Sequence, residues 1–196
     1  MSRKFEAGQL PTAEQLQAEL DRVKYRRRYR RVLGSTIFTL IGAAVVVLAV
    51  TLIFPVLRIS SDSMANTLTS GDLVMTLSGV ETRAGDVIAF NYGSGKVLVK
   101  RVIAEAGDVV EIREDGSVYV NEAKLDEPYV TKKALGECDI EMPYTVPEGR
   151  VFVLGDCRTE SLDSRNTAVG CVAEEQIIGR VALRIWPLGK IGLIGD

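Results

Sequence analysis

The pattern of apolar and polar positions divides the chain into a polar start, one long apolar run and a region of short apolar segments. Residues 33–54 form an uncharged apolar run, and about 20 such residues cross a bilayer core as a helix. Few helices of soluble proteins are apolar on every side over this length, and a cleavable signal peptide has an apolar core of only ~7–15 residues. We therefore predict an uncleaved transmembrane anchor over residues 32–55, rather than a buried core helix or a signal peptide.

The segment before the anchor, residues 1–31, is strongly basic towards its end. Residues 22–31 read RVKYRRRYRR and carry seven positive charges. Such a run alone can indicate a nuclear localisation signal or a nucleic-acid patch, but beside a spanning helix it is typical of the positive-inside pattern. It would also attract anionic membrane lipids. We predict a single-pass protein of the cytoplasmic membrane, with residues 1–31 in the cytoplasm and the part after the anchor outside.

A short amphipathic helix is expected over residues 12–24 of this basic segment. Thr12 stands three residues before Gln15, which is capping-box spacing, and Leu16, Leu20 and Val23 then recur at helical spacing. This helix would lead into the membrane anchor.

Residues 56–196 are predicted to form an all-β domain, so that the fold class is mostly β with one N-terminal transmembrane helix. Short β-rich runs follow the Gly-Asp turns at Gly71, Gly85 and Gly107, and another run ends at Asp156. The acidic, proline-containing stretch 122–148 is expected to leave the core, within a smaller excursion over residues 106–148. Further strands are expected over 96–103, 117–121, 151–154 and 177–186, with a turn or two of helix near residues 173–176.

Composition excludes several kinds of chemistry. The 196 residues include no histidine, which rules out Ser-His-Asp and Cys-His catalysis and His-ligated zinc. The three cysteines, Cys138, Cys157 and Cys171, show no CxxC spacing, so we expect free thiols. One disulfide is still allowed if this part of the chain lies outside the cytoplasm. Residues 58–196 carry a net charge of −7, which argues against a nucleic-acid binder.

A serine and a lysine can supply the nucleophile and base that histidine cannot. In the predicted strand around Lys100, alternation places this lysine with Leu98 and Val102 on one face, and Arg101 with Val97 and Val99 on the other. Burial among apolar neighbours lowers the pKa of a lysine, and a neutral amine can act as a general base for serine. On the pattern alone, the commoner case of a lysine at a sheet edge that reaches solvent is favoured.

The order of the motifs resembles that of bacterial type I signal peptidases. The matching motifs run from Arg58 to Trp186, and the single anchor is similar to the compact Gram-positive-like form of the family. The resemblance implies a membrane-anchored serine endopeptidase with a Ser/Lys dyad that removes signal peptides from exported preproteins with Ala-x-Ala-like residues before the cut. It implies no cofactor, no metal and no nucleic acid. The motifs are Ser63-Met64-x-x-Thr67-Leu68, Gly71-Asp72, Lys100-Arg101-Val102, Gly107-Asp108 and the box GDCRTESLDSR over residues 155–165.

The resemblance also implies individual roles. Ser63 matches the nucleophile and Lys100 its base, and the Ser63 N–H with the Ser61 hydroxyl matches the oxyanion donors. Ser161 matches the hydroxyl that orients the lysine amine, whereas Arg101 is expected to be structural. Asp163 and Arg165 match a supporting ion pair, with Asp156 and Arg158 in the same scaffold, and the positions that match substrate-binding residues are Ile59, Met64, Leu68, Val74 and Val99.

Two residues depart from the family pattern, and two other functions share part of it. Asn66 stands where the family usually has proline, which frees a backbone torsion near the nucleophile, and Cys157 stands where it usually has asparagine. A self-cleaving repressor-type Ser/Lys protease is disfavoured by the spanning helix. A catalytically idle membrane-anchored adaptor is disfavoured by the joint presence of Ser63, Lys100 and Ser161.

Overall fold

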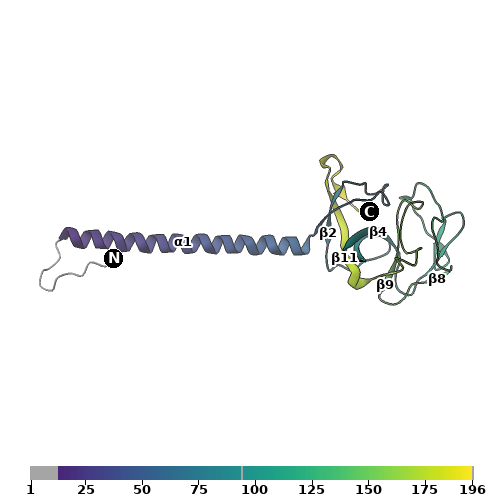
Figure 1. The fold of residues 1–196 in the computed structure, drawn as a ribbon, viewed down its shortest axis with the longest axis horizontal. Coiled ribbons are helices and arrows are strands. Elements are labelled where there is room, and N and C mark those ends of the chain that lie inside the picture. Colours follow the sequence, from purple (N-terminus) through teal and green to yellow (C-terminus); the bar gives the residue numbers. More distant parts are fainter. Residues whose placement is uncertain (1–12, 94, 196) are drawn as a thin grey trace. The chain divides into compact units, whose positions relative to one another are not determined.

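The N-terminal part of the chain is one long helix, α1 (Ala13–Ile53), which Figure 1 draws as an unbroken coil. The structure is a computed structural model that describes residues 13–93 and 95–195. The helix contains a candidate membrane span with a mean hydropathy of 2.6, none of which is buried inside the protein. This confirms the predicted apolar helix.

The helix expected over residues 12–24 is observed, from Ala13 onward, as the first part of α1. Residues 13–24 continue directly into the apolar run within α1, because neither proline nor a turn sequence interrupts residues 13–53. The expected capping box rests on Thr12 and on the Gln15 side chain, which lie outside the residues and side chains that the structure describes.

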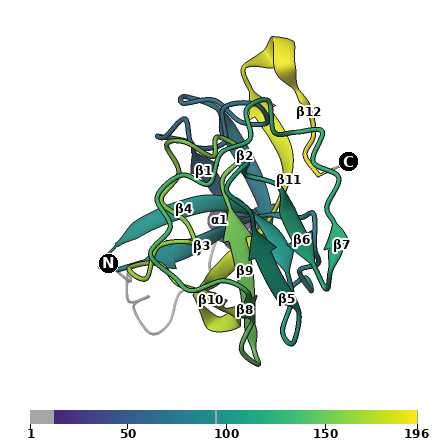
Figure 2. The same cartoon turned by 90° about the vertical axis from the view of Figure 1, so that its right-hand side faces the viewer.

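The second compact unit begins at Val50 and is built almost entirely from β-strands, as the sequence predicts. Its larger sheet has the antiparallel order β1-β2-β11-β3-β4-β9-β10, with β12 paired to β11 (Figure 2). The strands are β1 (Val56–Arg58), β2 (Leu73–Leu77), β3 (Val87–Tyr92), β4 (Lys96–Ala104), β9 (Arg150–Leu154), β10 (Val172–Ala173), β11 (Ile177–Trp186) and β12 (Gly192–Leu193).

A smaller sheet with the order β7-β6-β5-β8 is formed by residues 109–145. A long connection over residues 125–143 joins β7 to β8. Two short 3-10 helices complete the unit, one of them at the predicted position after Ala173. The elements are β5 (Val109–Ile112), β6 (Val118–Val120), β7 (Ala123–Lys124), β8 (Tyr144–Thr145), η1 (Glu174–Gln176) and η2 (Leu188–Lys190).

The Gly-Asp pairs form one recurring turn. The glycines at 71, 85 and 107 have φ values of +96°, +97° and +87°, a region that favours glycine because it has no Cβ. The following carboxylate accepts a hydrogen bond from the backbone N–H three residues before it, at 3.0 Å for Asp72 and 2.9 Å for Asp86 and Asp108. The turn therefore starts each strand at a defined residue.

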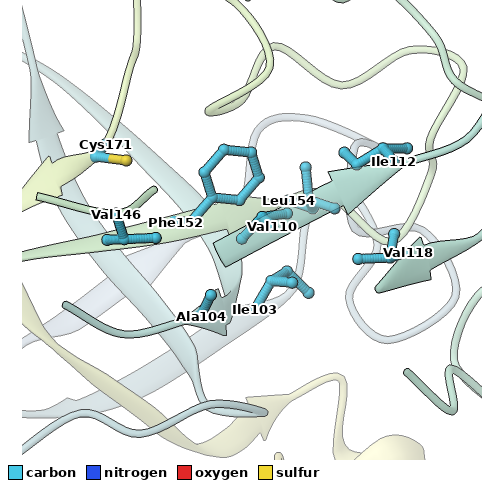
Figure 3. Close-up of a cluster of buried hydrophobic side chains, with 9 residues drawn as sticks. All are labelled: Ile103, Ala104, Val110, Ile112, Val118, Val146, Phe152, Leu154 and Cys171. Atoms are coloured by element: carbon cyan, nitrogen blue, oxygen red, sulfur yellow. The ribbon is translucent and has the colours of Figure 1, made fainter. Parts of the chain in front are cut away.

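Three buried apolar clusters hold the β unit together. One, shown in Figure 3, joins the two sheets, since it packs Val110 and Ile112 of β5 against Ile103 of β4 and Phe152 of β9. Each large apolar side chain buried in this way contributes about 1.5–3 kcal/mol. A second cluster packs residues of the 59–68 loop on β2, β3 and β11, and the third lies among β3, β4, β9 and β10.

Candidate active site

Ser63 lies in a tight turn after β1. The Ala65 N–H donates to Asp62 O at 2.9 Å and the Thr67 N–H to Met64 O at 2.8 Å. The side chains of Met64 and Leu68 enter the second apolar cluster. Their burial fixes the turn on the sheet, with the Ser63 side chain directed to the neighbouring strand β4.

The structure brings Ser63 and Lys100 together. Lys100 lies in the middle of β4, and its Nζ is 2.5 Å from Ser63 Oγ. The lysine is 2% exposed, so the structure shows a buried lysine, not the solvent-reaching one that the pattern alone favours. An amine at this distance can accept the hydroxyl proton directly once it is neutral.

Burial changes the charge state of this lysine. Desolvation lowers the pKa of Lys100 from 10.5 to about 8, with a smaller lowering from Arg165, while the negative charges of Asp163 and Asp156 partly oppose this shift. With a pKa of about 8, about a tenth of the amine is neutral at pH 7, whereas a pKa of 10.5 leaves about 0.03% neutral. Position and environment thus both suit Lys100 to act as a base.

The two expected oxyanion donors lie side by side. The Ser63 backbone N–H donates a hydrogen bond to Ser61 Oγ at 3.2 Å. Because Ser61 is exposed, its hydroxyl can rotate away and leave the Ser63 N–H free for an incoming carbonyl oxygen. The two groups are therefore neighbours, but in this arrangement they bond to each other.

The box over residues 155–165 packs directly behind Ser63. A Cβ at Gly155 would lie 2.1 Å from Ser161 Oγ and 2.8 Å from Ser63 O, so only glycine fits there. The Cys157 N–H donates to Ser63 O at 3.0 Å. Within the described residues, the buried Ser161 Oγ has no hydrogen-bond partner, so the implied bond to the Lys100 amine is not formed here.

Asp163 and Arg165 form the ion pair that the resemblance implies. Arg165 Nε and Nη2 donate to the two Asp163 carboxylate oxygens, each at 2.8 Å, and both side chains are buried. The Gly155 N–H also donates to Asp163 at 3.0 Å, and Arg165 Nη2 donates to Arg158 O at 3.0 Å. This pair therefore fixes the backbone on which Ser63 rests.

Arg101, expected to be structural, occupies the centre of a buried polar network. Its Nε and Nη2 donate to the two Asp156 carboxylate oxygens at 3.0 and 2.9 Å, and Nη2 donates to Thr67 Oγ1 at 3.0 Å. The Thr67 hydroxyl also donates to Asp156. The guanidinium carbon stacks 3.9 Å from the ring centroid of Tyr129. The network ties the turn that carries Ser63 to β4 and to the end of β9.

The two departures from the family pattern have different structural consequences. Asn66 Nδ2 donates to Tyr129 O at 2.9 Å and to Thr131 Oγ1 at 3.1 Å. These side-chain hydrogen bonds hold the loop at the position where the family usually has proline. The half-buried Cys157 thiol lies near Thr159 Oγ1, and all three cysteines are free thiols.

The five positions expected to bind substrate gather in one apolar cluster. Ile59, Met64, Leu68 and Val74 are buried members of the second cluster, and Val99 is half-buried against it. Met64, Leu68 and Val74 are at most 1% exposed. They therefore form the close-packed layer beneath Ser63.

Several residues of the site were not found by sequence reasoning. Tyr129 and Thr131 come from the connection between β7 and β8, and no local pattern marks them. Arg184 of β11 donates from Nη2 to Thr67 O at 2.7 Å, and its only sequence signal is that it is one of two arginines, with Arg180, among the apolar residues of this strand.

Comparison with known proteins matches residues 30–186 to the family described as "Signal peptidase, peptidase S26". Signal peptidase I U of Bacillus subtilis (strain 168) is 32% identical over 178 residues, covering 84% of this chain and 94% of that protein. Signal peptidase IB of Staphylococcus aureus is 36% identical over 151 residues, covering 67% and 78%. A solved signal peptidase I of Enterococcus faecalis V583 aligns with 52% of this chain and 97% of its own, at 31% identity and a TM-score of 0.44. The chain belongs to the signal peptidase family, peptidase S26.

Proposed function

We propose that this chain is a type I signal peptidase that removes signal peptides from exported preproteins, with Ser63 as nucleophile and Lys100 as general base. The observation that carries the proposal is the 2.5 Å contact between Lys100 Nζ and Ser63 Oγ. Lys100 is buried and its pKa is lowered to about 8. Since the chain contains no histidine, a neutral lysine is the nearest group able to take the serine proton.

The first half of the reaction forms an acyl-enzyme. The neutral Lys100 amine accepts the Ser63 proton while Ser63 Oγ attacks the carbonyl carbon before the cut. The Ser63 N–H and the Ser61 hydroxyl donate to the resulting oxyanion, and removal of one such donor typically costs about 10²–10³ in rate. The protonated Lys100 then gives its proton to the leaving amine, which departs with the mature protein.

The second half of the reaction regenerates the enzyme. A water molecule replaces the leaving amine, gives its proton to Lys100 and attacks the ester carbonyl. Collapse of this intermediate breaks the bond to Ser63 Oγ and returns the proton from Lys100 to the serine. The signal peptide leaves with a free carboxylate, and no cofactor takes part.

The specificity we propose is for small residues before the cut. The apolar layer beneath Ser63 is close-packed, and enlarging such a layer to admit a bulky side chain costs about 1–3 kcal/mol or more. Alanine, glycine or serine should therefore be accepted at the residue before the cut and two residues further back. Phenylalanine or lysine at the first of these positions should be rejected.

The membrane arrangement we propose follows from the charge pattern. Residues 1–31 carry the basic run and would stay in the cytoplasm, where anionic lipids attract them, residues 32–55 would span the bilayer, and residues 56–196 would act outside. This places the catalytic unit on the side where translocated preproteins emerge.

The test is cleavage of a preprotein bearing Ala-x-Ala by the full chain in detergent micelles, with the new N-terminus identified by mass spectrometry. We expect one cut, directly after the second alanine. Ser63→Ala should abolish it, whereas Ser70→Ala, an exposed serine of the same loop, should leave it unchanged. Cleavage by Ser63→Ala at the wild-type rate would refute the assigned nucleophile, and no cleavage by the wild-type chain would favour the adaptor.

A further inference from the structure

The exposed side chain of Asn66 holds the nucleophile turn, residues 62–68, from its solvent side. Its Nδ2 donates to Tyr129 O at 2.9 Å and to Thr131 Oγ1 at 3.1 Å, and Thr131 Oγ1 lies 3.4 Å from Asn66 Oδ1. Asn66 is three residues after Ser63, while its partners are more than 60 residues away in the chain. These bonds connect the nucleophile turn to the connection between β7 and β8.

The partner segment, residues 127–133, is itself firmly anchored. The buried Glu127 carboxylate forms ion pairs with Arg158, from the box behind Ser63, and with Lys133. The Val130 N–H donates to Glu127 O at 3.1 Å, and Val130 is buried. The 127–133 segment is therefore a fixed support against which an exposed amide can hold a turn.

The same segment meets the polar network behind the turn. The Tyr129 ring lies 3.9 Å from the Arg101 guanidinium carbon, and Arg101 donates to Thr67 Oγ1. Asn66 is thus connected to Tyr129 through the Tyr129 carbonyl. Thr67 is connected to the Tyr129 ring through Arg101. These contacts fix the solvent side and the buried side of the turn relative to each other.

The geometry points to Asn66 as a positioning residue: through its hydrogen bonds to the 127–133 segment it sets the place of Ser63 Oγ relative to Lys100 Nζ. This inference rests on the proposed role of Ser63 as nucleophile. Proton transfer and attack both depend on this distance, and a misplacement of about 1 Å can cost about 100-fold in rate. Because Asn66 is exposed and three residues from the nucleophile, its loss should change catalysis more than folding.

The test compares variants of the full chain in detergent micelles with a preprotein substrate. Asn66→Ala should lower kcat about fivefold, which is the effect expected from losing one net hydrogen bond, with KM unchanged. Asn66→Asp has the same shape but no donor for the Tyr129 carbonyl, so it should lose at least as much. Thr131→Val removes one of the two acceptors and should lose less, and adding it to Asn66→Ala should have no further effect.

Asn91→Ala is the matched control, since Asn91 is an exposed asparagine at the end of β3, and it should keep the wild-type kcat. A wild-type kcat in Asn66→Asp, or independent and multiplicative losses in Asn66→Ala with Thr131→Val, would overturn the inference. A loss of kcat that matches a fall in the folded fraction at the assay temperature would also overturn it. Failure of the proposed nucleophile role of Ser63 would give a different result, because Ser63→Ala would then retain cleavage.

Discussion

Replacing Lys100 with methionine tests the energetic cost of the buried amine. The pKa of Lys100 is lowered from 10.5 to about 8, mainly by burial, so the folded protein disfavours the charged form that the unfolded chain carries. Between pH 8 and 10.5 the unfolded chain binds more protons than the folded one. The free energy of unfolding of the wild type should therefore rise with pH across this window. Below it, the charged amine costs about 3 kcal/mol.

Methionine has a similar length and no charge, so the cost disappears in Lys100→Met. At pH 7 we expect the missing charge to raise the free energy of unfolding of the variant by about 3 kcal/mol. The lost hydrogen bond with Ser63 should lower it by about 1 kcal/mol. At pH 9.5 the gain from the missing charge should be about half as large. Urea unfolding of the full chain in detergent micelles, followed by the fluorescence of Trp186, the single tryptophan, measures the difference.

Lys96→Met is the matched control, because Lys96 is exposed at the start of the same strand. The stability of this variant should differ little from that of the wild type, because the Lys96 side chain is exposed. If the difference between Lys100→Met and wild type does not shrink between pH 7 and 9.5, the lysine is not desolvated. Lys100 would then lack the lowered pKa that a neutral base requires.

Four further predictions concern the base, the hydroxyl beside it and the membrane topology. Wild-type turnover should rise with pH through a limb near pH 8, as the Lys100 amine loses its proton. The Lys100→Arg variant should fold and bind substrate, but its kcat should fall about 10²–10⁴-fold because arginine stays charged. Ser161→Ala should lose less kcat than Lys100→Arg, since it removes a neighbouring hydroxyl and not the base, and an equal loss would contradict this order. In intact, wall-stripped cells, added protease should digest residues 58–196 and leave an N-terminal tag protected, and the reverse pattern would refute the topology.

The local features of the fold could be predicted because each depends on nearby residues. The apolar run, the turns at Gly71, Gly85 and Gly107 and the longer strands all follow from period and turn chemistry. Two-residue strands, such as β7 and β8, could not be found, because alternation is not detectable over that length, whereas the three-residue β6 lies within the strand expected over 117–121. The helix over residues 12–24 and the apolar anchor were both predicted, and they form one continuous helix because no residue between them breaks it.

Some features of the candidate site could likewise be predicted from the sequence, and others could not. The pairing of Ser63 with Lys100 was predicted from the motif resemblance, whereas the alternation around Lys100 alone favoured a lysine that reaches solvent. The positions of Tyr129 and Thr131 could not be predicted, because they depend on the path of a long connection that no local pattern fixes. The role of Arg101 likewise depends on where Asp156 and Thr67 meet in space.

Covalent labelling of the serine tests the central claim, a Ser63 nucleophile activated by Lys100, most directly. The full chain in detergent micelles would be treated with a serine-directed electrophile across a pH series, and the labelled peptide identified by mass spectrometry. The account predicts one adduct, on Ser63, with a labelling rate that rises as the pH passes about 8 and that is lost in Lys100→Arg. An adduct on another residue, or equal labelling rates in wild type and Lys100→Arg, would contradict it.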